Sequence, residues 1–575
     1  MPSFATFKKE LLNTMWFKIL SVLFIFLLYS NMCSAQIFQP DYFRNPLNIK
    51  MELVANFGEL RNNHWHMGLD IRTQQRENLP VHAAAAGYIS KIKIEPGGFG
   101  RAIYINHPNG LTTLYAHLNN FTPAIDKWVK EQQYKLESWA VELIVPPQLF
   151  PLSKGQFFAY SGNTGGSAGP HVHFEIRDTK TDKCLNPLIF RFPLSDNVPP
   201  TISRLAMYDR SRSVYSQSPQ MLPIKKTGSM YGMVKSDLVK VGSNRISFAI
   251  GATDRLSGSS NPNGVYSVQV KMDGNLVSGF ILNNIGYDET RYMNAHTDYR
   301  YKTIGGSWLQ HLSPMPGDAT SIYNTKSNEG VIVFNDEEAH LIRIEVKDAA
   351  QNISVIQLNV QYDPNVALNT ITPITDTWIP NYINAFEHDY FEAYSSETTV
   401  YDTVNVTYKK LDGISAKALG SAHYFLSSAI PAHDSFLVRL HSLDTLNDYQ
   451  KNCTVLLSTS GNRKVVKKAR WQGNWVWAFF RQFGTFQAFI DDVPPTINAP
   501  AASGNRIVFT PRDNFNSIRK FRAELDGKWL RFTNNGGKTW IYNYDEKFAL
   551  GTHELKVMVE DEAGNVTNKV WTVTR

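Results

Sequence analysis

Cysteine, blocks of basic residues and long apolar runs are all scarce in this chain, and each absence narrows what the protein can be. Its 575 residues contain three cysteines, so no disulfide framework can be inferred. The net charge of +7 is spread without a lysine- or arginine-rich block. Nucleic-acid binding is therefore unsupported, whereas weak attraction to an anionic polymer such as a cell wall is compatible with the charge.

The most apolar stretch, residues 19–29, is too short to cross a bilayer comfortably. Lysines precede it and small residues follow it: Lys8, Lys9 and Lys18, then Cys33, Ser34 and Ala35. This order predicts a cleaved signal peptide over residues 1–35, with Met15 as an alternative start. We therefore expect an exported protein of the periplasm, cell surface or medium, with no stable membrane span after cleavage. Residues 30–33 match a lipid-attachment site poorly, so a lipid anchor is a minor alternative.

The length predicts several domains, and two sequence repeats mark out the C-terminal part. Residues 198–202, Val-Pro-Pro-Thr-Ile, recur at 493–497, and the Asp-to-Asn turn at 348–352 returns at 561–565. Each pair brackets alternating, strand-like runs. We predict immunoglobulin-like β-sandwiches at 196–361, with an insertion around 283–328, and at 491–575. A β-rich module at 362–490, with strand-like runs at 400–408 and 436–440, is expected to separate them.

Residues 36–195 predict an antiparallel, all-β domain, because short alternating runs broken by glycine lie at 89–94, 102–105, 112–115 and 157–161. Residues 121–152 break this pattern. Their apolar positions, among them Ile125, Val129, Leu136 and Leu143, follow helical spacing, which predicts an inserted amphipathic helix that ends at Pro146-Pro147. Such a helix is either packing decoration or a lid over an active site.

A glycine-rich loop at residues 162–170 leads into a run with the period of a strand. Side chains two apart on a strand share a face, so His171 and His173 are expected to point the same way. Two interpretations stay open for this pair alone: ligands to a metal or substrate, or solvent-facing histidines. The glycines are better explained as a flexible groove edge than as a phosphate-binding loop, because no Gly-Lys-Ser/Thr follows.

A second motif supplies a nitrogen and an oxygen ligand four residues apart. His66 and Asp70 flank Gly68, which is expected to let the backbone turn between them, and His173 would complete a three-ligand zinc site with a fourth position open for water. Two histidines and one carboxylate suit zinc, whereas magnesium and calcium prefer mostly oxygen ligands. His64, His82 and His107 have no matching role and are expected to be surface or packed residues.

A third motif, residues 114–118, contains Tyr115 and His117. Strand alternation predicts that they share a face, so that His117 approaches the same cleft as His171. Two histidines left over beside a metal provide what proton transfer and oxyanion stabilisation require, because imidazole titrates near neutral pH.

Together these motifs resemble the lysostaphin-type, or LytM-type, zinc endopeptidases of peptidoglycan. The likeness covers about residues 57–176 and includes the turns at 83–87 and 107–110. It implies a small antiparallel β fold with a groove above one sheet. By residue, it implies that His66, Asp70 and His173 hold Zn²⁺, while His117 and His171 flank the attacking water and the developing oxyanion. The insertion at 121–152 departs from the family pattern.

The leading functional prediction is an exported zinc endopeptidase that cuts peptide bonds in peptidoglycan stems or cross-links. One alternative is a catalytically silent relative that binds and activates another cell-wall hydrolase. Another is an adhesin or scaffold built on the C-terminal β modules, which could also contact a cell-wall or protein partner.

Overall fold

The computed structural model describes residues 41–575 apart from 237, 327, 369–375, 412–416 and 535. The predicted signal peptide lies outside the described residues. We call residues 41–195, 196–361, 362–490 and 491–575 the first, second, third and fourth segments. The division of the chain into domains at these boundaries stays a prediction.

The first segment is built on a nine-stranded antiparallel sheet, as the sequence predicts. Seven strands follow in the order β1 (Leu53–Ala55), β4 (Leu69–Arg72), β13 (His171–Asp178), β8 (Leu111–Ala116), β7 (Arg101–Asn106), β6 (Gly87–Ile94) and β10 (Val141–Ile144). Two short strands extend it: β11 (Pro151–Leu152) on β6 and β14 (Cys184–Leu185) on β13. A second sheet contains β5 (Pro80–His82), β12 (Phe157–Ser161) and β9 (Leu118–Phe121), and β2 (Leu60–Arg61) pairs with β3 (His64–Trp65).

The core of this segment lies between the two larger sheets. Tyr115 and Phe174 from the large sheet pack against Phe158 and Leu118 from the small one, and all four are fully buried. A 3₁₀ turn, η1 (Pro187–Phe190), closes the segment and adds Phe190 to this core. The sheet pair therefore buries one face of β13 and leaves its other face for the site described below.

The inserted helix is shorter than the sequence predicts. Helix α2 (Pro123–Lys135) begins at a proline and ends near Glu137, which adopts a left-handed φ of 45°. The rest of the predicted helix is wrong, because residues 141–144 form strand β10 on the edge of β6. Val141, Leu143 and Val145 are buried while Ile144 is 76% exposed, which is the two-residue period of an edge strand.

The other three segments each contain two main sheets. In the second segment, one sheet has the strands β16 (Gln220–Leu222), β15 (Thr201–Asp209), β20 (Arg245–Thr253), β23 (Gln310–His311) and β24 (Ile332–Val333). The other has β17 (Ile224–Thr227), β18 (Met230–Met233), β26 (Ile353–Tyr362), β25 (Ala339–Lys347), β21 (Ser267–Met272), β22 (Asn275–Ile281) and β19 (Leu238–Val241). The expected insertion contains the short helices η3 (Thr290–Tyr292), α3 (Met293–His296) and α4 (Tyr299–Thr303), and two further 3₁₀ turns are η2 (Val214–Ser216) and η4 (Asn328–Gly330).

In the third segment, one sheet has β28 (Ala385–His388), β29 (Phe391–Tyr394), β33 (Phe436–His441), β37 (Trp475–Phe480) and β36 (Arg470–Gln472). The other has β31 (Tyr408–Leu411), β32 (Ala422–Phe425), β38 (Gly484–Ile490), β34 (Thr454–Ser460) and β35 (Arg463–Lys468). The pair β27 (Thr377–Trp378) and β30 (Val404–Asn405) and the helix α5 (Asp448–Asn452) complete it. The predicted strand at 400–408 is present only as β30 and the start of β31.

The fourth segment packs β39 (Ala501–Ser503), β40 (Arg506–Phe509) and β43 (Trp540–Asn543) against β42 (Lys528–Trp529), β41 (Ile518–Leu525), β44 (Thr552–Asp561) and β45 (Val566–Thr574). Side chains from both sheets, such as Phe509 and Val557, share one core. The all-β fold class with β-sandwich modules is therefore confirmed. The immunoglobulin-like type of the sandwiches stays a prediction.

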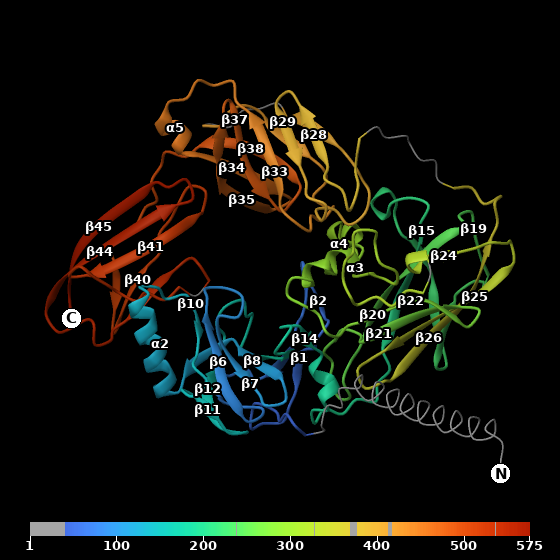
Figure 1. Ribbon diagram of the computed structural model, residues 1–575, viewed down its shortest axis with the longest axis horizontal. Coiled ribbons are helices and arrows are strands. Elements are labelled where there is room, and N and C mark those ends of the chain that lie inside the picture. The colour runs from blue at the N-terminus through green and yellow to red at the C-terminus, as the bar shows by residue number, and fades with distance from the viewer. Residues whose placement is uncertain (1–40, 237, 327, 369–375, 412–416, 535) are drawn as a thin grey trace, which may run out of the picture.

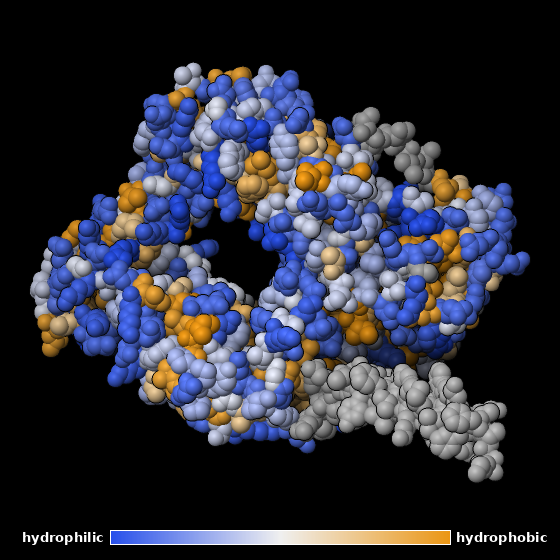
Figure 2. All heavy atoms as spheres, in the orientation of Figure 1, coloured by the Kyte–Doolittle hydropathy of each residue, from blue (hydrophilic) through white to orange (hydrophobic). Residues whose placement is uncertain are grey.

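The four segments surround an open centre, because the fourth segment returns to the inserted helix of the first (Figures 1 and 2). Tyr134 on α2 packs edge-on against Trp529 and donates a hydrogen bond to Asp545, and Glu137 pairs with Arg522 at 2.7 Å. The first and second segments also join closely, since Phe57, Trp65 and Met67 belong to the core cluster that runs through the second and third segments. Within the described part of the chain, no helix is both long and apolar enough to cross a membrane.

Candidate metal centre

Two adjacent strands and one loop bring the predicted ligands together. Asp70 on β4 lies directly opposite His173 on β13 in the antiparallel ladder, so their side chains leave the sheet on the same side. His66 follows β3 and reaches the same point from the loop before β4. All three side chains are buried.

Gly68 permits this approach in two ways. The backbone bends at Gly68, as the sequence predicts, although its φ is not positive. In addition, a Cβ at this position would lie 2.4 Å from the backbone oxygen of Phe174 and 3.0 Å from Nε2 of His173. Glycine is required because the loop packs directly against β13.

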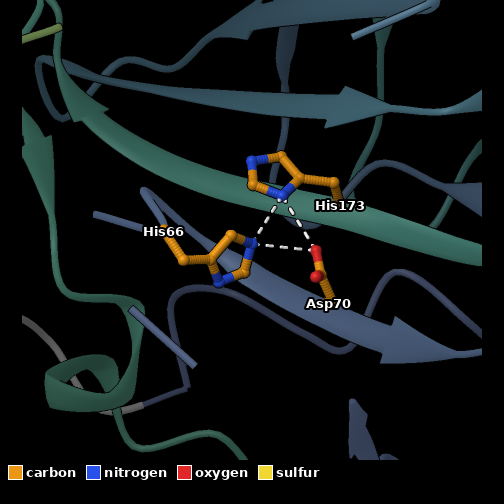
Figure 3. Close-up of side chains that lie close together, drawn as sticks. All are labelled: His66, Asp70 and His173. Atoms are coloured by element: carbon orange, nitrogen blue, oxygen red, sulfur yellow. Dashed lines mark hydrogen bonds and ion pairs between the residues drawn. The ribbon is translucent and has the colours of Figure 1, made fainter. Parts of the chain in front are cut away.

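The three predicted ligand atoms converge on one point (Figure 3). His66 Nε2 lies 2.9 Å from Asp70 Oδ1 and 3.0 Å from His173 Nδ1, and His173 Nδ1 lies 2.9 Å from the same Asp70 oxygen. The far nitrogen of each ring is already engaged. His66 Nδ1–H donates to the Asn56 carbonyl at 2.7 Å, and His173 Nε2–H donates to Glu175 Oε1 at 2.8 Å.

These hydrogen bonds leave lone pairs on the two nitrogens that face each other. A carboxylate oxygen and two imidazole lone pairs within 3.0 Å form an electron-rich point that requires a cation or a shared proton. Electrostatics agree: burial opposes the charged form of His173, but hydrogen bonds to Asp70 and Glu175 raise its pKa to about 9. The donor set of two imidazoles and one carboxylate fits zinc by ligand type.

A chain of charges behind His173 fixes its orientation. Glu175, fully buried, accepts from His173 with one oxygen, and Arg177 pairs with its other oxygen at 2.7 Å. Tyr287, from the second segment, donates to the same carboxylate at 2.5 Å. Burial opposes ionisation of Glu175, but Arg177 and His173 lower its pKa to about 2. Such partners orient a ligating histidine and set its tautomer.

His117 and His171 stand beside the three atoms. Their ring centroids are 4.7 Å apart, and His171 Nε2 lies 3.4 Å from Asp70 Oδ1. In each ring Nδ1–H donates to a loop carbonyl at 2.8 Å, from His117 to Thr164 and from His171 to Gly169. Because Nδ1–H makes these bonds, Nε2 of His117 and Nε2 of His171 face the site. Burial and the neighbouring His173 lower the pKa of His117 to about 3, so this imidazole is neutral at pH 7.

The prediction that Tyr115 shares a face with His117 is wrong. Tyr115 is fully buried in the core, where its hydroxyl accepts from the backbone N–H of Ala84. His117 follows the end of β8 with a left-handed φ of 57°, which breaks the alternation and turns its ring toward His171. His117 therefore reaches the site because the chain bends there. The prediction that His171 and His173 point the same way is confirmed, since both line one cavity.

That cavity has a volume of about 750 Å³ and extends over the three converging atoms. One wall is the glycine-rich loop, where Gly165 and Gly100 approach so closely that a Cβ on Gly165 would lie 2.2 Å from the nitrogen of Gly100. Phe99 and Tyr287 line another wall with their rings edge to face. Residues 121–152 contribute no lining residue, so α2 does not cover this cavity in the structure.

Sequence reasoning missed two residues at the site. Glu175 could have been found, because it continues the two-residue period of His171 and His173 along β13. Tyr287 carries no such signal, because it lies more than 100 residues away in another segment. Among the other histidines, His107 is a packed residue, as expected: it donates to the Ala86 carbonyl and accepts from Thr113.

Residues 64–134 match the family model described as Peptidase family M23, which includes His66, Asp70 and His117 and ends before His171. The DD-carboxypeptidase/endopeptidase Mpg of Neisseria meningitidis serogroup B is 34% identical over 112 residues, 20% of this chain and 20% of that protein. An "uncharacterized metalloprotease" of Haemophilus influenzae is 30% identical over 128 residues, 22% of this chain and 21% of that protein. The chain thus spans about a fifth of the length of these curated relatives. The catalytic domain of lysostaphin from Staphylococcus simulans is 21% identical, with a TM-score of 0.17, over 27% of this chain and 91% of that one.

Proposed function

Because the chain contains a domain of peptidase family M23, of the lysostaphin or LytM type, we propose that it is an exported zinc endopeptidase that hydrolyses peptide bonds in peptidoglycan stems or cross-links. The observation that carries the proposal is the convergence of His66 Nε2, Asp70 Oδ1 and His173 Nδ1 with both outer nitrogens already hydrogen-bonded. Two further histidines stand beside these atoms, which a metal site with a purely structural role would not need.

His66, Asp70 and His173 would hold the zinc ion. When bound, zinc would supply Lewis acidity and a water whose pKa is lowered to about 7. The chain's own residues supply the rest. Asp70 is kept ionised: burial opposes its charge, but the neighbouring His66, His171 and His173 hold its pKa well below the usual range. Glu175 holds His173 with its Nδ1 lone pair directed at the site.

His117 and His171 would divide proton transfer and charge stabilisation between them. Each presents Nε2 toward the cavity, because its Nδ1–H is held by a loop carbonyl. One imidazole would accept a proton from the attacking water during attack on the peptide carbonyl, and the other would stabilise the developing oxyanion. Rings held by backbone carbonyls keep this geometry without rearrangement during the reaction.

The proposal is tested by incubating the purified chain, without residues 1–35, with peptidoglycan sacculi and identifying the released fragments by mass spectrometry. The parent is expected to cut peptide bonds, and His117→Ala to slow release by about 10²-fold or more, the usual contribution of acid–base catalysis. His82→Ala is the matched control, because His82 lies outside the cavity. A zinc-loaded parent that releases no peptide, or a His117→Ala variant as active as the parent, would contradict catalysis. Stimulation of a second hydrolase by such an inactive chain would instead indicate the non-catalytic activator.

A further inference from the structure

The second and fourth segments, which share the two sequence repeats, each contain a trio of aspartates near the start of the segment's sandwich. The first trio is Asp196, Asp254 and Asp348, and the second is Asp491, Asp513 and Asp561. Within each trio, one carboxylate oxygen per residue lies within 4.8 Å of the others. The members come from equivalent places: the linker before the Pro-Pro pair, an early turn, and the turn before the last strand. Because three positions far apart in the sequence come together in the same way in both sandwiches, the trio is a common structural feature of the two.

The same hydrogen bonds hold both trios. Asn352 donates from its backbone and side chain to the two oxygens of Asp348, and its side chain also donates to the Asp196 carbonyl. Asn565 makes the same three bonds to Asp561 and the Asp491 carbonyl. Ser354 and Thr567 then fix the Pro200 and Pro495 carbonyls of the two linkers, at 2.5 and 2.6 Å.

This scaffold leaves buried oxygens without a partner. Asp254 is 4% exposed, and its Oδ1 accepts no hydrogen bond. Asn263 is 3% exposed, and its Oδ1 is also unpartnered. The backbone N–H of Asp254 donates to the Asn263 carbonyl at 2.9 Å, and that of Asn263 donates to the Asp254 carbonyl at 2.8 Å. In such an antiparallel bridge the two side chains lie on the same side. In the second trio, Asp513 Oδ1 is likewise unpartnered.

In the part of the chain that the structure describes, no positive side chain compensates these carboxylates. Among the described residues, no lysine, arginine or histidine forms an ion pair with any of the six aspartates. Burial and the charges of Asp196 and Asp348 raise the pKa of Asp254 to about 7. Burying an uncompensated carboxylate next to two others is costly, and a bound cation removes that cost.

We propose that each trio binds a calcium ion, joined in the first trio by the Asn263 amide oxygen. The ligands are all oxygens, which favours a hard cation over zinc, and their spread over loops suits the flexible coordination of calcium better than the strict octahedron of magnesium. Asp196 and Asp491 lie on linkers, whereas the other four aspartates belong to the sandwiches. Each ion would therefore fasten a linker to the sandwich that follows it.

The test is calorimetric titration of calcium into the zinc-loaded full chain, with magnesium as the comparison cation. The parent is expected to bind two calcium ions, and Asp254→Asn and Asp513→Asn one each. Asp448→Asn, an exposed aspartate on α5, should still bind two. A parent that binds no calcium, or an Asp254→Asn variant that still binds two, overturns the proposal.

Thermal unfolding separates a lost site from a damaged fold. Calcium should raise the unfolding temperature of the parent, and it should raise that of Asp254→Asn less. In calcium-free buffer Asp254→Asn should be at least as stable as the parent, because it removes an unpaired buried charge. If Asp254→Asn does not fold, Asp196→Asn, at the partly exposed linker position, replaces it in the test. Asp196→Asn is expected to bind one calcium ion. If it still binds two, the first calcium site is overturned.

Discussion

At the scale of single residues, Glu175 should control the metal affinity without touching the metal. Glu175→Gln keeps the shape of the side chain but removes the charge that holds His173 Nε2–H. We predict zinc binding about 10- to 100-fold weaker, the usual effect of losing a partner behind a ligand. Competition with a chromophoric chelator measures this affinity. Glu142→Gln, an exposed residue paired with Lys91, is the matched control, and equal affinities for the two variants would contradict the role of Glu175.

Single residues also show what the sequence could and could not predict. Motif spacing placed His66, Asp70, His117, His171 and His173 around one cavity, because the ligand types and strand period are local properties. The physical reasons were predicted only in part. Gly68 serves close packing as well as the bend, and His117 faces the site through a left-handed φ that alternation does not predict. Tyr287 depends on contact between segments, which no local pattern encodes.

At the scale of elements, short strands were predicted well and the inserted helix was not. Strand β12 matches its predicted bounds, because alternation with flanking glycine leaves few options. In residues 136–145, however, apolar positions fit a helical and a two-residue period equally. The edge of β6 decides the outcome, because it offers unpaired backbone groups to β10. A partner strand that is distant in the sequence thus overrides a local periodicity.

Two buried histidines in the second segment should make its stability fall in acid. Burial lowers the pKa of His296 and of His311 to about 3, below the ordinary 6.5. Between these values the unfolded chain binds more protons, so the free energy of unfolding should fall as pH drops below 6.5. The expected loss between pH 7.5 and 5.5 is about 1 kcal/mol for each histidine. Urea unfolding of the second-segment transition at the two pH values measures it.

His311→Leu should remove part of this pH dependence, because neither nitrogen of His311 has a hydrogen-bond partner in the described structure. His388→Leu, at an exposed position, should leave the dependence unchanged. An equal slope in the parent and in His311→Leu would show that His311 does not stay neutral in the folded state.

At the scale of the whole molecule, the closed arrangement of the segments could not be predicted from the sequence. Repeats and Pro-Pro linkers indicate where the sandwiches lie. The return of the fourth segment to α2 depends on contacts such as Tyr134 with Trp529, which resemble ordinary surface side chains in the sequence. In the structure, helix α2 provides the contact surface for the fourth segment.

Because the first two segments share a core, we predict that a fragment without the second segment is less stable and binds less zinc. A fragment of residues 36–195 would expose Phe57 and Met67, which the second segment buries, at a cost of about 1.5–3 kcal/mol for each such side chain. It would also lose the Tyr287 bond to Glu175. We expect it to unfold at a lower temperature and to hold less zinc than residues 36–361. Scanning calorimetry and metal analysis test this, and equal values for the two fragments would contradict a shared core.

Anomalous diffraction at the zinc edge, from crystals of the zinc-loaded full chain, tests most directly whether His66, Asp70 and His173 hold zinc. We expect an anomalous peak about 2 Å from His66 Nε2, Asp70 Oδ1 and His173 Nδ1, the usual zinc bond length, with the rings of His117 and His171 beside it. An anomalous map with zinc bound elsewhere and no density among these three atoms would contradict this expectation.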